Sequence, residues 1–114
     1  MYIGLVAKPL RWLGASRRDV RGFPPEARRV AGYQLLRVQE GMEPSDWKPM
    51  TTVGSGMREI RIRTDTEHRV CYVARFEEAI YVLHAFEKRT QKTLARDIDL
   101  ARTRYRELLE WRQE

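Results

Sequence analysis

The chain has 114 residues, of which 42% are hydrophobic and 33% are charged. This length suits a single domain over residues 1–114 with a modest core, and the composition excludes collagen-like, fibrous and disordered proteins. The 22 Lys and Arg residues outnumber the 16 Asp and Glu residues, which gives a net charge of +6. Lysine occurs at only four of these cationic positions, 8, 48, 88 and 92. The excess is therefore mostly guanidinium, which favours bidentate contact with phosphate or carboxylate.

Cysteine usage and hydropathy limit the cellular compartments in which the protein is expected. Cys71 is the single cysteine, so the sequence predicts no internal disulfide and no thiolate metal cluster. The opening MYIGLVAKPL lacks a basic region followed by a long apolar one, and no stretch approaches the roughly 18 apolar residues of a membrane span. We expect a cytoplasmic protein without contact to a membrane.

Two helices are predicted in the first third of the chain. A short extended piece at 10–13 precedes Ser16, which we expect to cap a brief helix that ends at Gly22. A longer helix follows from Pro24 and Pro25, because apolar residues then recur at helical spacing: Ala27, Ala31, Leu35, Val38 and Met42. Residues 41–57 are rich in Gly and Pro and are predicted to form a loop that includes a short strand at most.

In the second half of the chain, apolar residues first recur at every second position, which is the spacing of a β-strand. Ile60 and Ile62 alternate with charged residues from 58 to 63, a turn is predicted at 64–67, and segments 68–76 and 79–86 are rich in β-branched and aromatic residues. These three strands are predicted to form an antiparallel meander. A closing helix starts near Thr93, with apolar residues at helical spacing: Leu94, Ile98, Ala101, Tyr105 and Leu108. The fold class is α+β, a small antiparallel sheet with N-terminal helices and a C-terminal helix packed on one sheet face.

A cluster of cations is predicted on the meander. Glu59, Arg61 and Arg63 share one face of their strand, and Arg69 opens the next strand, so Arg69 is expected beside Arg61 or Arg63. Like charges directly opposite each other cost stability, so the cluster calls for an anion. Glu59 could supply it internally and a phosphodiester could supply it externally. The alternative is an ordinary solvated strand face.

The end of the third strand adds further candidates. Lys88, Arg89 and Lys92 follow one another closely before the last helix, either as a solvated basic turn or as the completion of a pocket begun by Arg61 and Arg69. Such a pocket would hold an RNA backbone. Tyr72 alternates with aliphatic residues, which indicates packing, although an aromatic on an open sheet face can also stack on an unpaired base.

The histidines and the cysteine support no metal site. His68 and His84 with one cysteine are too few ligands, and no HExxH or CxxC pattern occurs, so we expect no metal and no cofactor. His84 lies in the apolar run YVLHAF and is either a hydrogen-bonded core histidine or a proton carrier. His68 is expected to be exposed in a turn, and Cys71 to be a small buried hydrophobe.

The ordered segments carry a family resemblance. Six segments lie in order between residues 8 and 108, within a resemblance that runs from about Lys8 to Arg112: KPLRWLGASRRDVRGFP, QEGMEPSDWKPM, MREIRIR, HRVCYVARF, YVLHAFEKRTQKT and DIDLARTRYREL. Together they resemble the phage-derived, HigB-like branch of the RelE/ParE superfamily of type II toxins. The resemblance implies a small antiparallel sheet flanked by helices. It also implies a ribosome-associated mRNA endonuclease that uses no metal or cofactor and is neutralised by a HigA-like helix-turn-helix antitoxin.

The resemblance also points to particular positions. The motif residues of that branch correspond here to Glu59, Arg61, Arg69, His84, Lys88 and Arg89, and Lys48 matches a recurrent lysine on the loop before the sheet. RNA cleavage by a 2′-hydroxyl needs cations for the phosphoryl oxygens, a base and an acid. We assign Arg61, Arg69 and Arg89 to the phosphate, while His84, Lys88, Lys48 and Glu59 remain candidates for proton transfer.

Two other functions stay open. A ParE-like toxin of the same fold would bind a protein target and cleave nothing. A basic nucleic-acid-binding regulatory module would use the same charge without catalysis.

Overall fold

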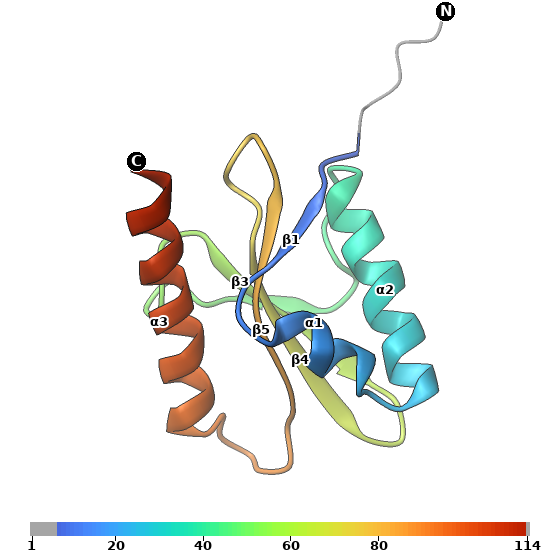
Figure 1. Cartoon of the computed structure of the whole chain (residues 1–114). Helices are drawn as coiled ribbons and strands as arrows, with labels where there is room; N and C mark the ends of the chain where they lie inside the picture. Colours follow the sequence, from blue (N-terminus) through green and yellow to red (C-terminus); the bar gives the residue numbers. More distant parts are fainter. Residues whose placement is uncertain (1–6, 114) are drawn as a thin grey trace, which may run out of the picture.

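The computed structural model describes residues 7–113, and in it a five-stranded sheet is combined with three helices (Figure 1). The strand order across the sheet is β1-β5-β4-β3-β2, so the two shortest strands form its edges. The elements in chain order are β1 (Leu10–Trp12), α1 (Ser16–Arg21), α2 (Pro25–Gln39), β2 (Trp47–Pro49), β3 (Met57–Arg63), β4 (Glu67–Val73), β5 (Ile80–Glu87) and α3 (Ala95–Arg112). No helix within residues 7–113 has the length and apolar character needed to cross a bilayer.

The sheet is mixed. Strands β3, β4 and β5 form the predicted antiparallel meander, and β2 adds to β3 in the antiparallel sense. Strand β1, however, runs parallel to β5, with Leu10 opposite Ile80 and Trp12 opposite Val82. The predicted α+β fold with an antiparallel meander is confirmed, and β1 adds a parallel edge strand that the prediction did not include. Three extended residues carry no local signal of their pairing partner.

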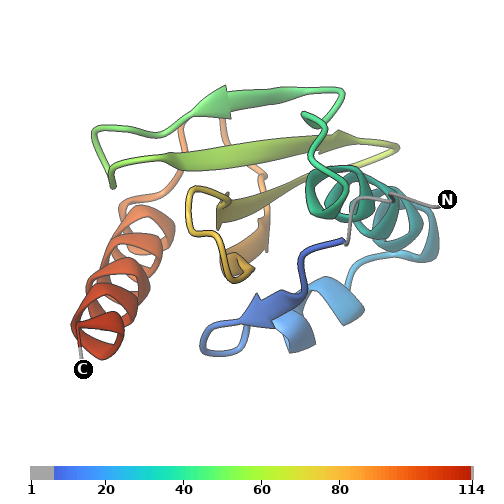
Figure 2. The ribbon, with the colours of Figure 1, turned by 90° about the horizontal axis from the view of Figure 1, so that it is seen from above.

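Helices cover both faces of the sheet (Figures 1 and 2). One core lies under α1 and α2 and takes Ile60, Ile62, Val70 and Tyr72 from the sheet. A second core lies under α3 and takes Met57, Cys71, Val73, Tyr81 and Leu83. The expectation of helices on one face only was wrong, because odd and even positions of β4 and β5 are both apolar and each set has its own helical cover.

Three boundaries differ from the sequence prediction. Ala15, not Ser16, is the N-cap residue of α1, and the buried Ser16 hydroxyl instead donates to the carbonyl of Val82 at 3.1 Å. Helix α2 ends at Gln39, and Gly41 follows with φ +85°, which leaves Met42 outside the helix and exposed rather than on its buried face. Strand β4 ends at Val73, earlier than the predicted Phe76.

Gly54 allows the loop before β3 to pack closely against α3. A Cβ placed on Gly54 would overlap Cδ2 of Tyr105, whose buried ring is held by a hydrogen bond from its hydroxyl to the carbonyl of Ser55. We expect Gly54→Ala to destabilise the fold by about 1–3 kcal/mol through overpacking. This would lower the midpoint of thermal unfolding by several degrees.

Gly32→Ala is the matched control for this prediction. Gly32 lies inside α2, and a Cβ placed there would have nothing within 4 Å, so the same substitution should stabilise the helix by about 0.5–1 kcal/mol. Equal melting temperatures for Gly54→Ala and the parent protein would show that Tyr105 moves aside without cost.

Candidate functional site

A basic cleft of about 970 Å³ opens on the α3 side of the sheet. Its walls are β2, β3 and β4 on one side and the turn between β5 and α3 on the other. Among the described residues that line it, the charged ones are seven cations and one carboxylate: Lys48, Arg61, Arg63, Arg69, Lys88, Arg89, Lys92 and Glu67. The arrangement can hold an anion with several negative oxygens.

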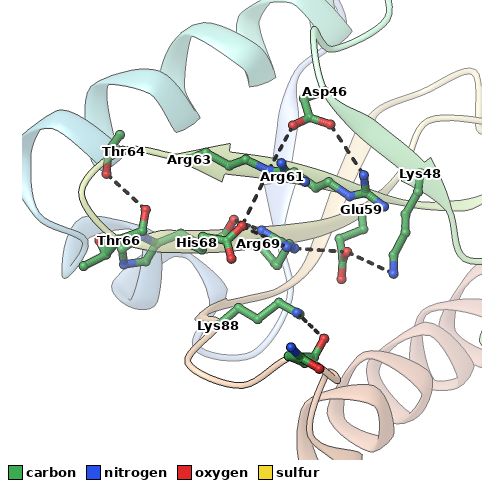
Figure 3. Close-up of polar contacts among 12 residues, drawn as sticks. Asp46, Lys48, Glu59, Arg61, Arg63, Thr64, Thr66, His68, Arg69 and Lys88 are labelled. Carbon is green, nitrogen blue, oxygen red and sulfur yellow. Dashed lines mark hydrogen bonds and ion pairs between the residues drawn. The ribbon is translucent and has the colours of Figure 1, made fainter.

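The β3–β4 hairpin brings the central arginines together. Arg61 lies directly opposite Arg69 in the ladder (Figure 3), and Arg63 lies opposite Glu67. Because side chains alternate along a strand, all four project to the same face while Ile60 and Ile62 project to the other. The predicted neighbourhood of Arg61 and Arg69 is confirmed, and it follows from the short turn that sets the hairpin register.

A buried carboxylate lies beneath the arginines. The Glu59 side chain is 0% exposed, with Oε1 at 3.3 Å from Nε of Arg69 and at 3.7 Å from Nζ of Lys48. Neither oxygen of Glu59 accepts a hydrogen bond from a described residue, so these contacts are ion pairs whose donors are poorly aligned. The Arg69 side chain is itself only 5% exposed, and it also donates to the carbonyl of His68 at 3.2 Å. Glu59 is thus an internal counter-ion of the cluster.

Two carboxylates at the surface complete the network. Oδ1 of Asp46 lies 3.8 Å from Arg61 and its Oδ2 lies 3.4 Å from Nε of Arg63. Oε1 of Glu67 lies 3.5 Å from Nε of Arg63 and 3.5 Å from Nη2 of Arg69. Sequence reasoning missed both. Glu67 could have been predicted from the sequence, because it follows Arg63 across the predicted turn. Asp46 could not, because it reaches the cluster from the loop before β2.

The turn after β5 supplies the outer cations. The ammonium of Lys88 donates to the carbonyls of Thr90 at 2.9 Å and Gln91 at 2.6 Å, which ties it to its own turn. Arg89 is exposed and donates to Glu87 at 3.0 Å, and this hydrogen bond lowers the pKa of Glu87. Lys92 is exposed at the rim.

His84 lies apart from the cleft lining. Its Nδ1 accepts from Nη1 of Arg104 at 3.3 Å, and because arginine only donates, the proton sits on Nε2, which donates to Oδ1 of Asp97 at 2.8 Å. A bulge in the β4–β5 ladder skips Leu83 and turns both Leu83 and His84 toward α3. His84 therefore anchors the start of α3, with both ring nitrogens already engaged. Asp97 and Arg104 gave no sequence signal for this contact.

Three further expectations are resolved by burial. Tyr72 is 0% exposed and packs under α2, on the sheet face opposite the cleft, so the predicted packing is confirmed and the alternative, RNA binding by stacking on a base, is wrong. His68 was expected to be exposed but is buried against the ring of Phe23, with centroids 4.3 Å apart, and this burial lowers its pKa. Cys71 is buried as predicted, and desolvation raises the pKa of its thiol.

The described residues contain no group of three or more His, Cys, Asp and Glu side chains placed to hold a metal ion. The model of the family described as phage-derived protein Gp49-like (DUF891) matches residues 18–106, a range that includes every cation of the cleft lining. No curated protein matches the chain. Toxins of this family are associated with toxin–antitoxin systems and normally pair with an antitoxin. Since the match covers most of the sequence, the chain belongs to the Gp49-like family of RelE/HigB-like toxins.

Proposed function

We propose that this protein is a HigB-like toxin that cleaves messenger RNA at the ribosome in the cytoplasm. The observation that carries the proposal is the pairing of Arg61 with Arg69 on one sheet face, in a cleft whose lining is dominated by cations. A sheet that places two guanidinium groups opposite each other gains stability when an anion lies between them. An RNA phosphodiester suits this position because its two non-bridging oxygens match the guanidinium geometry.

The reaction needs charge stabilisation at one phosphate. The 2′-oxygen forms a bond to the adjacent phosphorus, its proton passes to a base, the bond from phosphorus to the 5′-oxygen breaks, and an acid protonates that oxygen. Negative charge builds on the phosphoryl oxygens during this displacement, and donors fixed beforehand stabilise it most. We assign this role to Arg61 and Arg69, whose backbones are held in the β3–β4 ladder.

Proton transfer falls to groups that can lose a proton within the cleft. Arginine cannot do so, and His84 lies outside the cleft lining with both nitrogens engaged. Lys48 and Lys88 line the cleft, and Glu59 lies beneath it beside Lys48. We favour Lys48, because the Lys88 ammonium is held by two carbonyls of its own turn.

The remaining cations extend the surface along an RNA backbone. Arg63, Arg89 and Lys92 are exposed at the cleft rim, where they would contact neighbouring phosphates and give binding that weakens as salt rises. The same surface favours an antitoxin with an acidic segment, since the chain carries a net charge of +6. The HigA-like helix-turn-helix antitoxin is the partner that we propose.

The proposal predicts which arginines control cleavage. Arg61→Ala and Arg69→Ala should each slow cleavage of ribosome-bound message by about 10²–10³-fold, the usual cost of removing one donor to a developing oxyanion. Cleavage is measured by primer extension on a defined message, with thermal unfolding of each variant recorded alongside.

Arg102→Ala is the matched control. It removes the same charge from α3, where Arg102 pairs with Asp99 outside the cleft lining, and should leave cleavage near the parent rate. Parent-like cleavage by both Arg61→Ala and Arg69→Ala would remove the cleft from the reaction. A toxic protein that leaves every transcript intact would point instead to a ParE-like, protein-binding toxin.

A further inference from the structure

Two carboxylates already occupy positions between the arginines of the cleft. The two oxygens of Asp46 are shared between Arg61 and Arg63, at 3.8 Å and 3.4 Å (Figure 3). A single oxygen of Glu67 lies 3.5 Å from both Arg63 and Arg69. Each carboxylate therefore bridges a pair of guanidinium groups, as the non-bridging oxygens of a phosphodiester would. The protein holds its own anions where a phosphate is expected.

These bridges are weak enough to open. The side chains of Asp46 and Glu67 are 43% and 44% exposed, so water stabilises both carboxylates when they leave. At separations of 3.4–3.8 Å, none of the four contacts has hydrogen-bond geometry, and the carboxylate of each pair is partly screened by water.

Glu59 provides the contrast within the same cluster. It is 0% exposed and lies under Arg69, whereas the side chains of Asp46 and Glu67 are 43% and 44% exposed. A ligand in the cleft can take over the partners of Asp46 and Glu67 without moving Glu59. The network thus separates into one fixed counter-ion and two exchangeable ones.

We propose that Asp46 and Glu67 are exchangeable counter-ions that compete with the phosphates of a single-stranded RNA for Arg61, Arg63 and Arg69, and thereby lower the affinity of the cleft for RNA. The inference rests on the proposed function, because it takes the ligand to be an RNA backbone. In the free protein the two carboxylates reduce repulsion among the arginines and keep their side chains at the cleft. On binding, each phosphodiester replaces a carboxylate, and the carboxylate turns to water.

The proposal specifies the effect of neutralising each carboxylate. A neutral amide no longer competes for the guanidinium groups and no longer repels the incoming phosphate. Glu67→Gln and Asp46→Asn should therefore each tighten RNA binding by about three- to tenfold at low salt, a gain that shrinks as salt rises.

Asp65→Asn is the control that separates local competition from net charge. Asp65 is exposed in the same hairpin, two positions from Glu67, and has no ion pair among the described residues. Asp65→Asn changes the net charge by the same amount as the other two substitutions. It should alter the affinity for RNA by less than about twofold, because salt screens the interaction of an exposed charge with a phosphate that it does not contact.

The experiment measures anisotropy of a fluorescein-labelled 2′-O-methyl RNA oligonucleotide, which cannot be cleaved because it lacks the attacking hydroxyl. Tighter binding by Glu67→Gln and Asp46→Asn than by Asp65→Asn supports the proposal. Equal effects of all three substitutions, or weaker binding by Glu67→Gln and Asp46→Asn, would overturn it. The parent protein is tested in parallel for cleavage of message: selective tightening without any cleavage leaves the counter-ion inference standing and rejects only the nuclease activity.

Discussion

Lys48→Ala is expected to slow cleavage of ribosome-bound message by about 10²–10⁴-fold, the range that one general acid or base contributes. Lys48 lies on β2 opposite Glu59, its side chain lines the same cleft as Arg61 and Arg69, and its ammonium is 3.7 Å from the buried Glu59 carboxylate. As an ammonium, Lys48 therefore carries the proton that the departing 5′-oxygen needs, beside the arginines that hold the phosphate. Single-turnover cleavage at saturating toxin separates this loss of rate from any loss of binding.

Lys48→Arg tests whether the proton or the charge matters. Arginine keeps the positive charge at β2 but does not release a proton under these conditions, so this variant should be nearly as slow as Lys48→Ala. Parent-like cleavage by Lys48→Arg would show that position 48 supplies charge alone. Lys92→Ala removes a cation at the cleft rim and, as the control for lost charge, should weaken binding in a salt-dependent way with little effect on the chemical step.

The sequence predicted the candidate site best where the site residues lie close together along the chain. The alternation of Ile60 and Ile62 with charged residues, followed by a short turn, was enough to place Arg61 beside Arg69, because one hairpin fixes its own register. Lys88, Arg89 and Lys92 line the cleft, which is one of the two arrangements that their position between the last strand and the last helix allowed.

What the sequence could not predict depends on contacts between distant segments. The parallel pairing of β1 with β5 is decided by packing, and so is the choice of helix for each sheet face, because apolar residues at both odd and even positions of β4 and β5 indicate cover on both faces without identifying the helix. The bulge that turns His84 toward Asp97 arises from one skipped residue in a ladder. Asp46 reaches Arg61 from the loop before β2, and no spacing rule connects the two.

Glu59 offers the largest expected effect on stability. Glu59→Leu should lower the free energy of unfolding by about 3 kcal/mol, because it removes one partner of a buried ion pair and leaves the Arg69 guanidinium, 5% exposed, with only the surface carboxylate Glu67. Arg69→Met should cost a similar amount, since it leaves Glu59 buried beside Lys48 alone. Urea titration at neutral pH measures both.

The double variant decides whether the pair itself stabilises the fold. Glu59→Leu with Arg69→Met replaces both charges by apolar groups of similar size, and we expect its stability to return to within about 1 kcal/mol of the parent protein. Arg63→Met, the exposed control at 57% side-chain exposure, should change stability by less than about 1 kcal/mol. If the two buried substitutions were simply additive, Glu59 and Arg69 would not be energetically coupled, and the retention of a buried carboxylate under the cleft would need another cause. Recovery in the double variant together with loss of cleavage would mean that the buried pair is kept for the arginine it positions and not for stability.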